Sequence, residues 1–221
     1  MAGRAIYSAS YPKEFMESAW THRGYYGDGA GRCNITSIID SLDDRPAIVV
    51  GSGGTTDEIF EDYYSAMDKN PGAVVFAVND IGVYLPTVHH LVSLHEDNLQ
   101  AWAQLRKDKH SRKGFATHSI IGADWNWEGI VPIMPISGYF AMQIAWVMGA
   151  GKIVLVGCPG DNTRRFFDRK ARDDFHYQEK GVLQQVESEM RRLPEFKAAV
   201  RSMSGFTRDF FGADDKGVSD G

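Results

Sequence analysis

The chain has 221 residues, 43% of them hydrophobic and 24% charged, which is typical of a globular protein and excludes a disordered or fibrous one. Single domains usually contain about 100–200 residues, so we expect one domain with one buried core. The formal net charge of -5 offers no basic surface for a polyanion, so no stable nucleic-acid binding is expected. Cys33 and Cys158 have no metal-binding or redox spacing, as is usual in a reduced cytosolic protein, although a disulfide between them stays open.

The amino-terminal part is rich in Gly, Tyr and Ser without clean periodicity, which predicts an irregular arm or cap over residues 1–45. Its aromatic segment, Tyr7–Tyr26, is a candidate for burial against a second subunit, so a homo-oligomer stays open. No apolar run follows the first residues, so we expect no signal peptide and a cytoplasmic location. Residues 130–150 carry no charge, but prolines and polar side chains interrupt them, so we expect a buried loop and a core helix rather than a membrane span.

Regular patterns begin at Pro46–Val50, an apolar run between charged residues and glycines that predicts a buried parallel strand. Residues 57–68 then place apolar side chains on one helical face, with Thr55 or Thr56 as the N-cap. The alternation continues with predicted strands at Ala73–Val78, Leu91–Leu94 and Phe115–Ile121, and with a helix at Glu96–Lys109 whose Leu99, Trp102 and Leu105 face inward.

The second half of the chain repeats this alternation. Residues 125–127 are expected in a long loop, and Gly138–Met148, apolar nearly all round, predicts a fully buried helix. Further elements are predicted as a strand at Lys152–Val156, a helix from Tyr177 to Arg192 and a last strand at Ala198–Met203. Together they predict an α/β fold, a Rossmann-like doubly wound, mostly parallel sheet with helices on both faces, in residues 46–211, followed by a frayed tail at 212–221.

A glycine-rich turn, GSGGTTD, stands between the first predicted strand and the first predicted helix. Glycines let a backbone approach an anion, and a helix start offers free N–H groups, so the turn predicts a phosphate or nucleotide site. The turn is neither a complete G-x-G-x-x-G motif nor a P-loop, and a tight strand-to-helix connection is the alternative. The predicted contacts are Gly51, Ser52, Gly53, Gly54 and Thr55.

Three other pairs of residues are expected near the same edge of the sheet. Asn79 and Asp80 end the second strand, where they would contact a ligand or merely cap a turn. Ser137 and Gly138 open the buried helix, as a second anion-binding helix start or as a simple N-cap. Arg164 and Arg165 lie in the charged segment 161–174, as a diphosphate clamp or as solvated charges.

The histidines suggest no metal centre. His89, His90 and His95 have suggestive spacing but no acidic or Cys partner, so no metal ligand is predicted. His118 is expected to be a hydrogen-bonded core residue. His176 closes the charged segment and begins a helix, which suits either a general base or a surface residue.

The series AIVVGSGGTTDE, FAVND and ISGYFAMQIAWVMGAGKIVLVGCPG, followed by His176 at a helix start, resembles the sialyltransferase-like superfamily. That group includes bacterial sialyltransferases, motility-accessory glycosyltransferases and 6-hydroxymethylpterin diphosphokinases. The resemblance covers about Ala47 to Met203. It implies that the Gly51–Gly54 turn, Asn79 and the Ser137–Gly138 pair contact a nucleotide or nucleotide sugar, and that His176 is the catalytic base of a glycosyltransferase-like enzyme that needs no cofactor.

Two departures from the family pattern leave alternatives open. The family turn reads G-N-G-P-S where this chain has Gly51-Ser52-Gly53-Gly54-Thr55, and the paired lid tyrosines of sialyltransferases are missing. One alternative is a diphosphotransferase that requires Mg²⁺, for which Asp57, Asp80 and Asp161 are candidate ligands. The other is a non-catalytic nucleotide-binding or scaffold protein of the same fold. The acceptor is not identified by the sequence.

Overall fold

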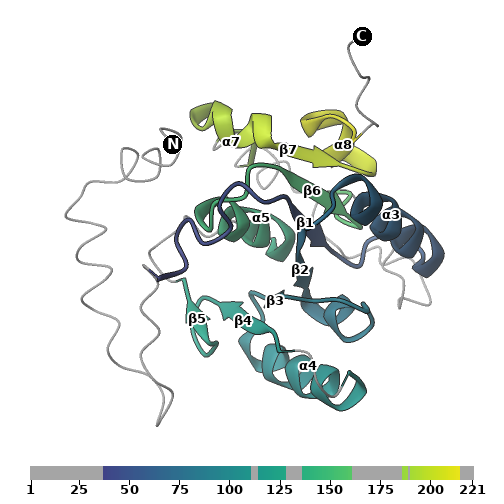
Figure 1. The fold of residues 1–221 in the computed structure, drawn as a ribbon, viewed down its shortest axis with the longest axis vertical. Helices are drawn as coiled ribbons and strands as arrows, with labels where there is room; N and C mark the ends of the chain where they lie inside the picture. Colours follow the sequence, from purple (N-terminus) through teal and green to yellow (C-terminus); the bar gives the residue numbers. More distant parts are fainter. Residues whose placement is uncertain (1–36, 111–113, 128–135, 161–185, 189, 215–221) are drawn as a thin grey trace.

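The computed structural model describes residues 37–110, 114–127, 136–160, 186–188 and 190–214. Within these residues, seven strands form one sheet in which every neighbouring pair is parallel. Helices cover both faces of the sheet (Figure 1). The chain therefore has the expected α/β, Rossmann-like architecture.

Most predicted elements correspond to elements of the structure, whereas the helix predicted from Tyr177 to Arg192 lies mostly outside the described residues. The strands are β1 (Ala47–Val50), β2 (Val74–Val78), β3 (His90–Val92), β4 (Ala116–Ser119), β5 (Trp125–Asn126), β6 (Ile153–Val156) and β7 (Val200–Ser202). The helices are α3 (Thr56–Lys69), the 3-10 helix η2 (Asn79–Val83), α4 (Glu96–Lys109), α5 (Ser137–Val147), α7 (Pro194–Ala199) and α8 (Gly205–Phe211).

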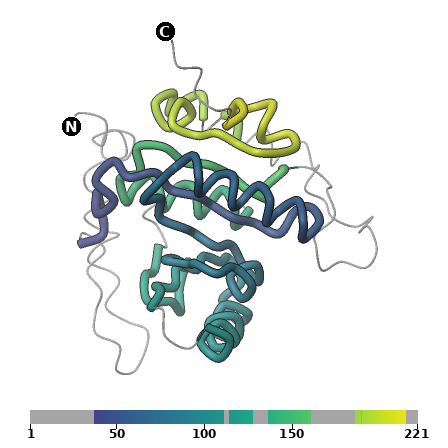
Figure 2. Tube along the Cα trace, turned by 45° about the vertical axis from the view of Figure 1, so that its right-hand side comes forward, coloured from purple at the N-terminus to yellow at the C-terminus, as the bar shows by residue number. Residues whose placement is uncertain are grey.

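The order of the strands reverses once along the sheet. From β1 to β5 each new strand is added on the same side, and the chain then returns so that β6 pairs with the free side of β1 and β7 follows β6. Figures 1 and 2 both show α7, β7 and α8 at one edge of the molecule and α4 at the other. Ligands of open α/β sheets bind outside the carboxyl ends of the strands at such a reversal, here between β1 and β6.

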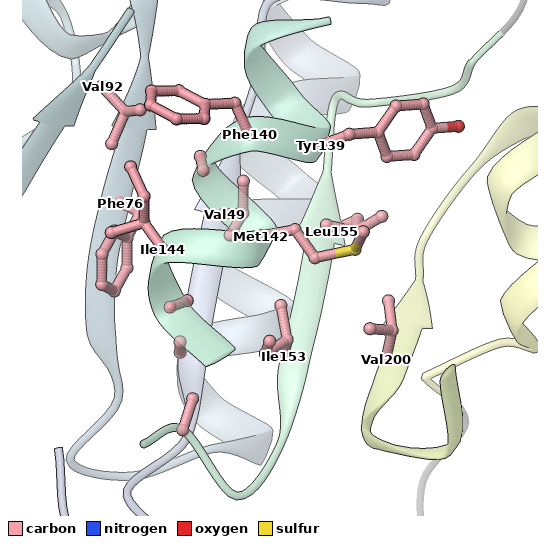
Figure 3. Close-up of a cluster of buried hydrophobic side chains, with 14 of the residues drawn as sticks. Val49, Phe76, Val92, Tyr139, Phe140, Met142, Ile144, Ile153, Leu155 and Val200 are labelled. Atoms are coloured by element: carbon pink, nitrogen blue, oxygen red, sulfur yellow. The ribbon is translucent and has the colours of Figure 1, made fainter. Parts of the chain in front are cut away.

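Alternate residues of the strands divide the core into two layers. Val49 of β1 belongs to a cluster with residues of α5, and Ile48 of the same strand belongs to a second cluster that contains residues of α3 and α4. Figure 3 shows the first layer, with Phe140 of α5 against Val92 and Met142 against Leu155. Because both faces are covered, the strands are continuous apolar runs, which made them visible in the sequence.

The described end of the expected arm, residues 37–45, is held against α5. The N–H groups of Asp40, Leu42 and Asp44 donate to the carbonyls of residues 147, 148 and 149, at distances of 3.2, 2.7 and 3.0 Å. These carbonyls belong to the last turn of α5 and the residues just after it, where a helix leaves acceptors without internal partners. Residues 37–45 therefore cap α5.

The expected frayed tail begins with packed residues. Asp214 is 4% exposed, and its carboxylate pairs with Lys152 and accepts from the side-chain amide of Asn70. Its carbonyl accepts from Lys69. Residues 212–214 are thus anchored between α3 and β6, and residues 215–221 lie outside the described part.

Some local predictions were wrong. Trp125–Asn126 is a short parallel strand beside β4 rather than a loop. Leu105 is 53% exposed, whereas Arg106, 1% exposed, takes the inward position on α4 because the carbonyls of Gly82 and Leu85 accept its guanidinium hydrogens. The helices η2, α7 and α8 were not predicted, and the first two residues of the strand predicted at Ala198–Met203 belong to α7. In the described part of the chain, no helix has the length and apolarity required to cross a membrane.

Candidate functional site

The turns after β1 and β6 touch at the reversal of strand order. The Gly53 N–H donates to the Gly157 carbonyl at 2.9 Å. A Cβ on Gly51 would lie 2.5 Å from that carbonyl oxygen, and a Cβ on Gly53 would lie 2.6 Å from Cδ of Pro159. Glycine at positions 51 and 53 is therefore required for the close packing of these turns, as the alternative of a tight connection predicted.

Cys158 links the β1 turn to the start of α5. Its Sγ would lie 2.7 Å from a Cβ on Gly51 and 3.2 Å from a Cβ on Gly138. Burial raises the pKa of the Cys158 thiol to about 12, against the weaker opposing effect of a hydrogen bond with the Gly51 backbone. The raised pKa disfavours the thiolate, and the sulfur packs between the two glycines. The position of Cys158 also shows that the turn after β1 and the start of α5 lie on the same side of the molecule.

The start of α3 is closed by one of its own acidic side chains. Thr55 is the N-cap, and its N–H and hydroxyl both donate to Oε2 of Glu58, each at 2.8 Å. The Glu58 N–H donates back to the Thr55 hydroxyl at 3.3 Å, which completes a capping box. The hydrogen bonds from Thr55 hold the pKa of Glu58 below its ordinary value. A carboxylate thus occupies the position at which Thr55 was expected to meet a phosphate.

The start of α5 is different. The N-cap is Ile136, which has no side chain able to cap, and the first turn has no acidic residue. Ser137, expected as a possible N-cap, instead accepts the Leu94 N–H on its Oγ at 3.3 Å. No described residue accepts a hydrogen bond from the N–H groups of Ser137 and Gly138. Both residues are buried, so two backbone donors stand at a helix start that carries no negative charge.

Asn79 and Asp80 open η2, directly after β2. Asn79 is in the left-handed region, with φ of 59°. Its Oδ1 accepts from the hydroxyl of Ser93 at 2.7 Å, and the same hydroxyl accepts the His95 N–H at 2.8 Å. The predicted position of Asn79 at the carboxyl edge is therefore found, and Ser93, which the sequence analysis did not single out, fixes its side chain.

The remaining predicted site residues fall outside the described part of the chain. These are His176, Arg164 and Arg165, together with Asp161 of the magnesium alternative and the Tyr7–Tyr26 arm. The structure accordingly describes three parts of the candidate site, namely the turn after β1, the 3-10 helix η2 and the start of α5. The roles of His176, Arg164 and Arg165 remain predictions.

The histidines of β3 and β4 are joined by hydrogen bonds in the core. Trp127 Nε1 donates to Nδ1 of His118 at 3.0 Å, and Nε2 of His118 lies 2.8 Å from Nδ1 of His90. Because Trp127 only donates, His118 carries its proton on Nε2 and donates that hydrogen bond to Nδ1 of His90. Burial lowers the pKa of His118 well below its usual value and that of His90 to about 4, where His89 and Arg45 add to the effect. His118 is confirmed as a hydrogen-bonded core residue.

In the described residues, no three His, Cys, Asp or Glu side chains are grouped so that they could hold a metal ion. The candidate site therefore consists of backbone donors, glycines and one oriented amide at the carboxyl edge of the sheet. Compared with family models, curated proteins and solved structures, the chain matches none of them.

Proposed function

We propose that the protein is a glycosyltransferase-like enzyme that binds a nucleotide or a nucleotide-activated sugar at the carboxyl ends of β1, β2 and β6. The observation that carries the proposal is the start of α5, where the Ser137 and Gly138 N–H groups have no acceptor among the described residues. The start of α5 lies across Cys158 from the β1 turn, at the reversal of strand order. Free N–H groups and the helix dipole favour an anion at such a position.

The phosphate of the nucleotide is assigned to α5 rather than α3. At α3, the Glu58 carboxylate already accepts from Thr55, and its charge repels a second anion. At α5, the first turn has no acidic residue. The role proposed for the Gly51–Gly54 turn is therefore to let the end of β1 approach α5 and the nucleotide closely. The main hydrogen-bond donors to the phosphate come from α5.

The proposed reaction is a displacement at the anomeric carbon of the sugar. An acceptor hydroxyl oxygen forms a bond to that carbon while the bond from the carbon to the nucleotide phosphate oxygen breaks, and the phosphate leaves with the electron pair. His176, assigned by the resemblance, takes the proton of the acceptor hydroxyl. Arg164 and Arg165 would neutralise the leaving phosphate.

A nucleotide-binding protein without turnover is the second candidate, and the capped start of α3 favours it, since one of two helix starts at the site is closed to phosphate. The magnesium-dependent diphosphotransferase is a third alternative, in which ATP binding would require Mg²⁺. Asp80 and Asp57 are its described candidate ligands, and they belong to no described group of three possible metal ligands.

The test is thermal unfolding of the full chain with CMP, UDP and ATP, the last with and without Mg²⁺. At a concentration about 100 times Kd, a bound nucleotide adds about 2.7 kcal/mol to the free energy of unfolding, which raises Tm by several degrees in a domain of this size. His176→Ala should keep that shift and abolish release of the nucleotide from its sugar donor. Absence of a shift with every nucleotide would contradict the proposal, and binding without any donor turnover would favour the non-catalytic candidate.

A further inference from the structure

We propose that Ser93 is a positioning residue that turns the side-chain amide of Asn79 so that only its NH₂ group faces a ligand. The inference rests on the proposed function, because it concerns how the same site selects its nucleotide. It assigns to Asn79 the role of hydrogen-bond donor, and so predicts that the ligand atom beside it is an acceptor such as a carbonyl, a ring nitrogen without hydrogen or a phosphate oxygen.

The lengths of the hydrogen bonds determine which way the amide is turned. The Ser93 hydroxyl lies 2.7 Å from Oδ1 of Asn79, the usual length of an O–H···O bond and shorter than the usual N–H···O bond. The hydroxyl also accepts the His95 N–H at 2.8 Å. The carbonyl of His95, at 3.5 Å, is too far to compete for the hydroxyl hydrogen. The hydrogen of Ser93 therefore goes to Asn79, and the oxygen arm of the amide is the one that faces Ser93.

The other arm of the amide is left for a ligand. Nδ2 of Asn79 makes no hydrogen bond with a described residue, and the side chain is half-buried at the carboxyl end of β2, beside β1. Its backbone holds φ of 59°, a conformation that most side chains disfavour. The contact that holds the amide in one orientation is therefore the hydrogen bond from a fully buried serine.

The experiment measures the affinity of the full chain for CMP, UDP and ATP by calorimetry, in wild type and variants. Ser93→Ala should weaken binding of whichever nucleotide binds wild type about fivefold to tenfold, the worth of one oriented hydrogen bond. Asn79→Asp keeps the bond from Ser93 and tolerates the backbone angle, but replaces both N–H donors with an acceptor, so it should weaken binding at least tenfold.

Ser119→Ala is the matched control. Ser119 is as fully buried as Ser93 and ends the neighbouring strand β4, but its hydroxyl has no hydrogen-bond partner among the described residues. Its replacement should leave the affinity within about twofold of wild type. A second background, Asn79→Gly, removes the amide and still accommodates the positive φ. In that background Ser93→Ala should have no effect on affinity, because no amide is left to orient.

The outcomes separate the two proposals. If wild type binds none of the nucleotides, the proposed function fails and the inference with it. If wild type binds one and both Ser93→Ala and Asn79→Asp bind it equally well, the inference alone is overturned. It is likewise overturned if Ser93→Ala weakens binding as much in the Asn79→Gly background as in wild type, since Ser93 would then act through the fold and not through the amide.

Discussion

The turn that leads into α3 and the start of α5 lie on either side of Cys158, and the two helix starts have opposite chemistry. At α3, Glu58 caps Thr55 and supplies a negative charge. At α5, no side chain caps the helix, and the N–H groups of Ser137 and Gly138 have no acceptor in the described part of the chain. Two helix starts at one edge of a sheet are therefore not equivalent anion sites. The difference is a carboxylate that is present in the first turn of α3 and absent from the first turn of α5.

The largest expected effect comes from separating the turns after β1 and β6, whose contact holds the β1 turn beside Cys158. Gly51→Ala would place a Cβ 2.5 Å from the Gly157 carbonyl oxygen and 2.7 Å from Sγ of Cys158, so the backbone of the two turns must move. We expect a loss of about 3 kcal/mol of unfolding free energy, measured by urea denaturation. Gly114→Ala, where a Cβ meets nothing within 4 Å, is the control and should change stability little. Equal stability of the two variants would contradict the close packing.

The pair of neutral histidines in the core, His90 and His118, predicts that the fold loses stability in acid. The folded pKa of His90 is about 4, below the unfolded value of about 6.5. The unfolded chain therefore binds more protons between these values, and stability is fully present above pH 6.5 and falls as the pH drops toward 4.

The loss should be about 2 kcal/mol, allowing for the partial exposure of His90. Urea denaturation at a series of pH values measures it. In His90→Gln the dependence between pH 6.5 and 4 should become shallower, and an unchanged slope would show that His90 does not contribute.

A direct way to break the difference between the helix starts is to give α5 the charge that α3 has. Ser137→Asp places a carboxylate in the first turn of α5, where it would compete with a phosphate for the free N–H groups. Nucleotide affinity should fall about tenfold relative to Ser137→Asn, which has the same shape without the charge. Calorimetric titration compares the two variants, and equal affinities would place the phosphate elsewhere.

The smallest effect is expected from the reverse change. Glu58→Ala removes the carboxylate from Thr55 and frees its N–H and hydroxyl. Inorganic phosphate should then shift the Thr55 backbone amide resonance in NMR spectra, and it should not do so in wild type. Thr55 and Glu58 are exposed, so only a small decrease in Tm is expected. A phosphate-induced shift already present in wild type would show that Glu58 does not close this helix start.

The fold was predictable where burial alone decides it. β1, β2 and β6 are continuous apolar runs, and α5 is apolar all round, so each was found within a residue or two of its bounds. β5 was missed because a strand of two residues is defined by its pairing with β4 and not by its own pattern. The inward Arg106 was missed because its acceptors, the carbonyls of Gly82 on η2 and of Leu85 just after it, are far away in sequence.

The site was predictable to the level of segments. The turn after β1, Asn79 and the start of α5 were expected at the carboxyl edge, and they lie there. The sequence T-T-D-E at residues 55–58 contains a capping-box signature that would have identified Glu58 as the partner of Thr55. Ser93 gave no such signal, because its bond to Asn79 joins the ends of two different strands.

Asp214 sets a limit on how far the carboxyl terminus can be shortened. Its contacts reach the last residue and the C-cap of α3 and the residue before β6. Removing it takes an acceptor from the ammonium groups of Lys69 and Lys152 and leaves the amide of Asn70 with the Ala66 carbonyl alone. A protein truncated at residue 211 should be cut by proteases at lower temperature than one truncated at residue 214. Affinity tags are accordingly best joined beyond this aspartate.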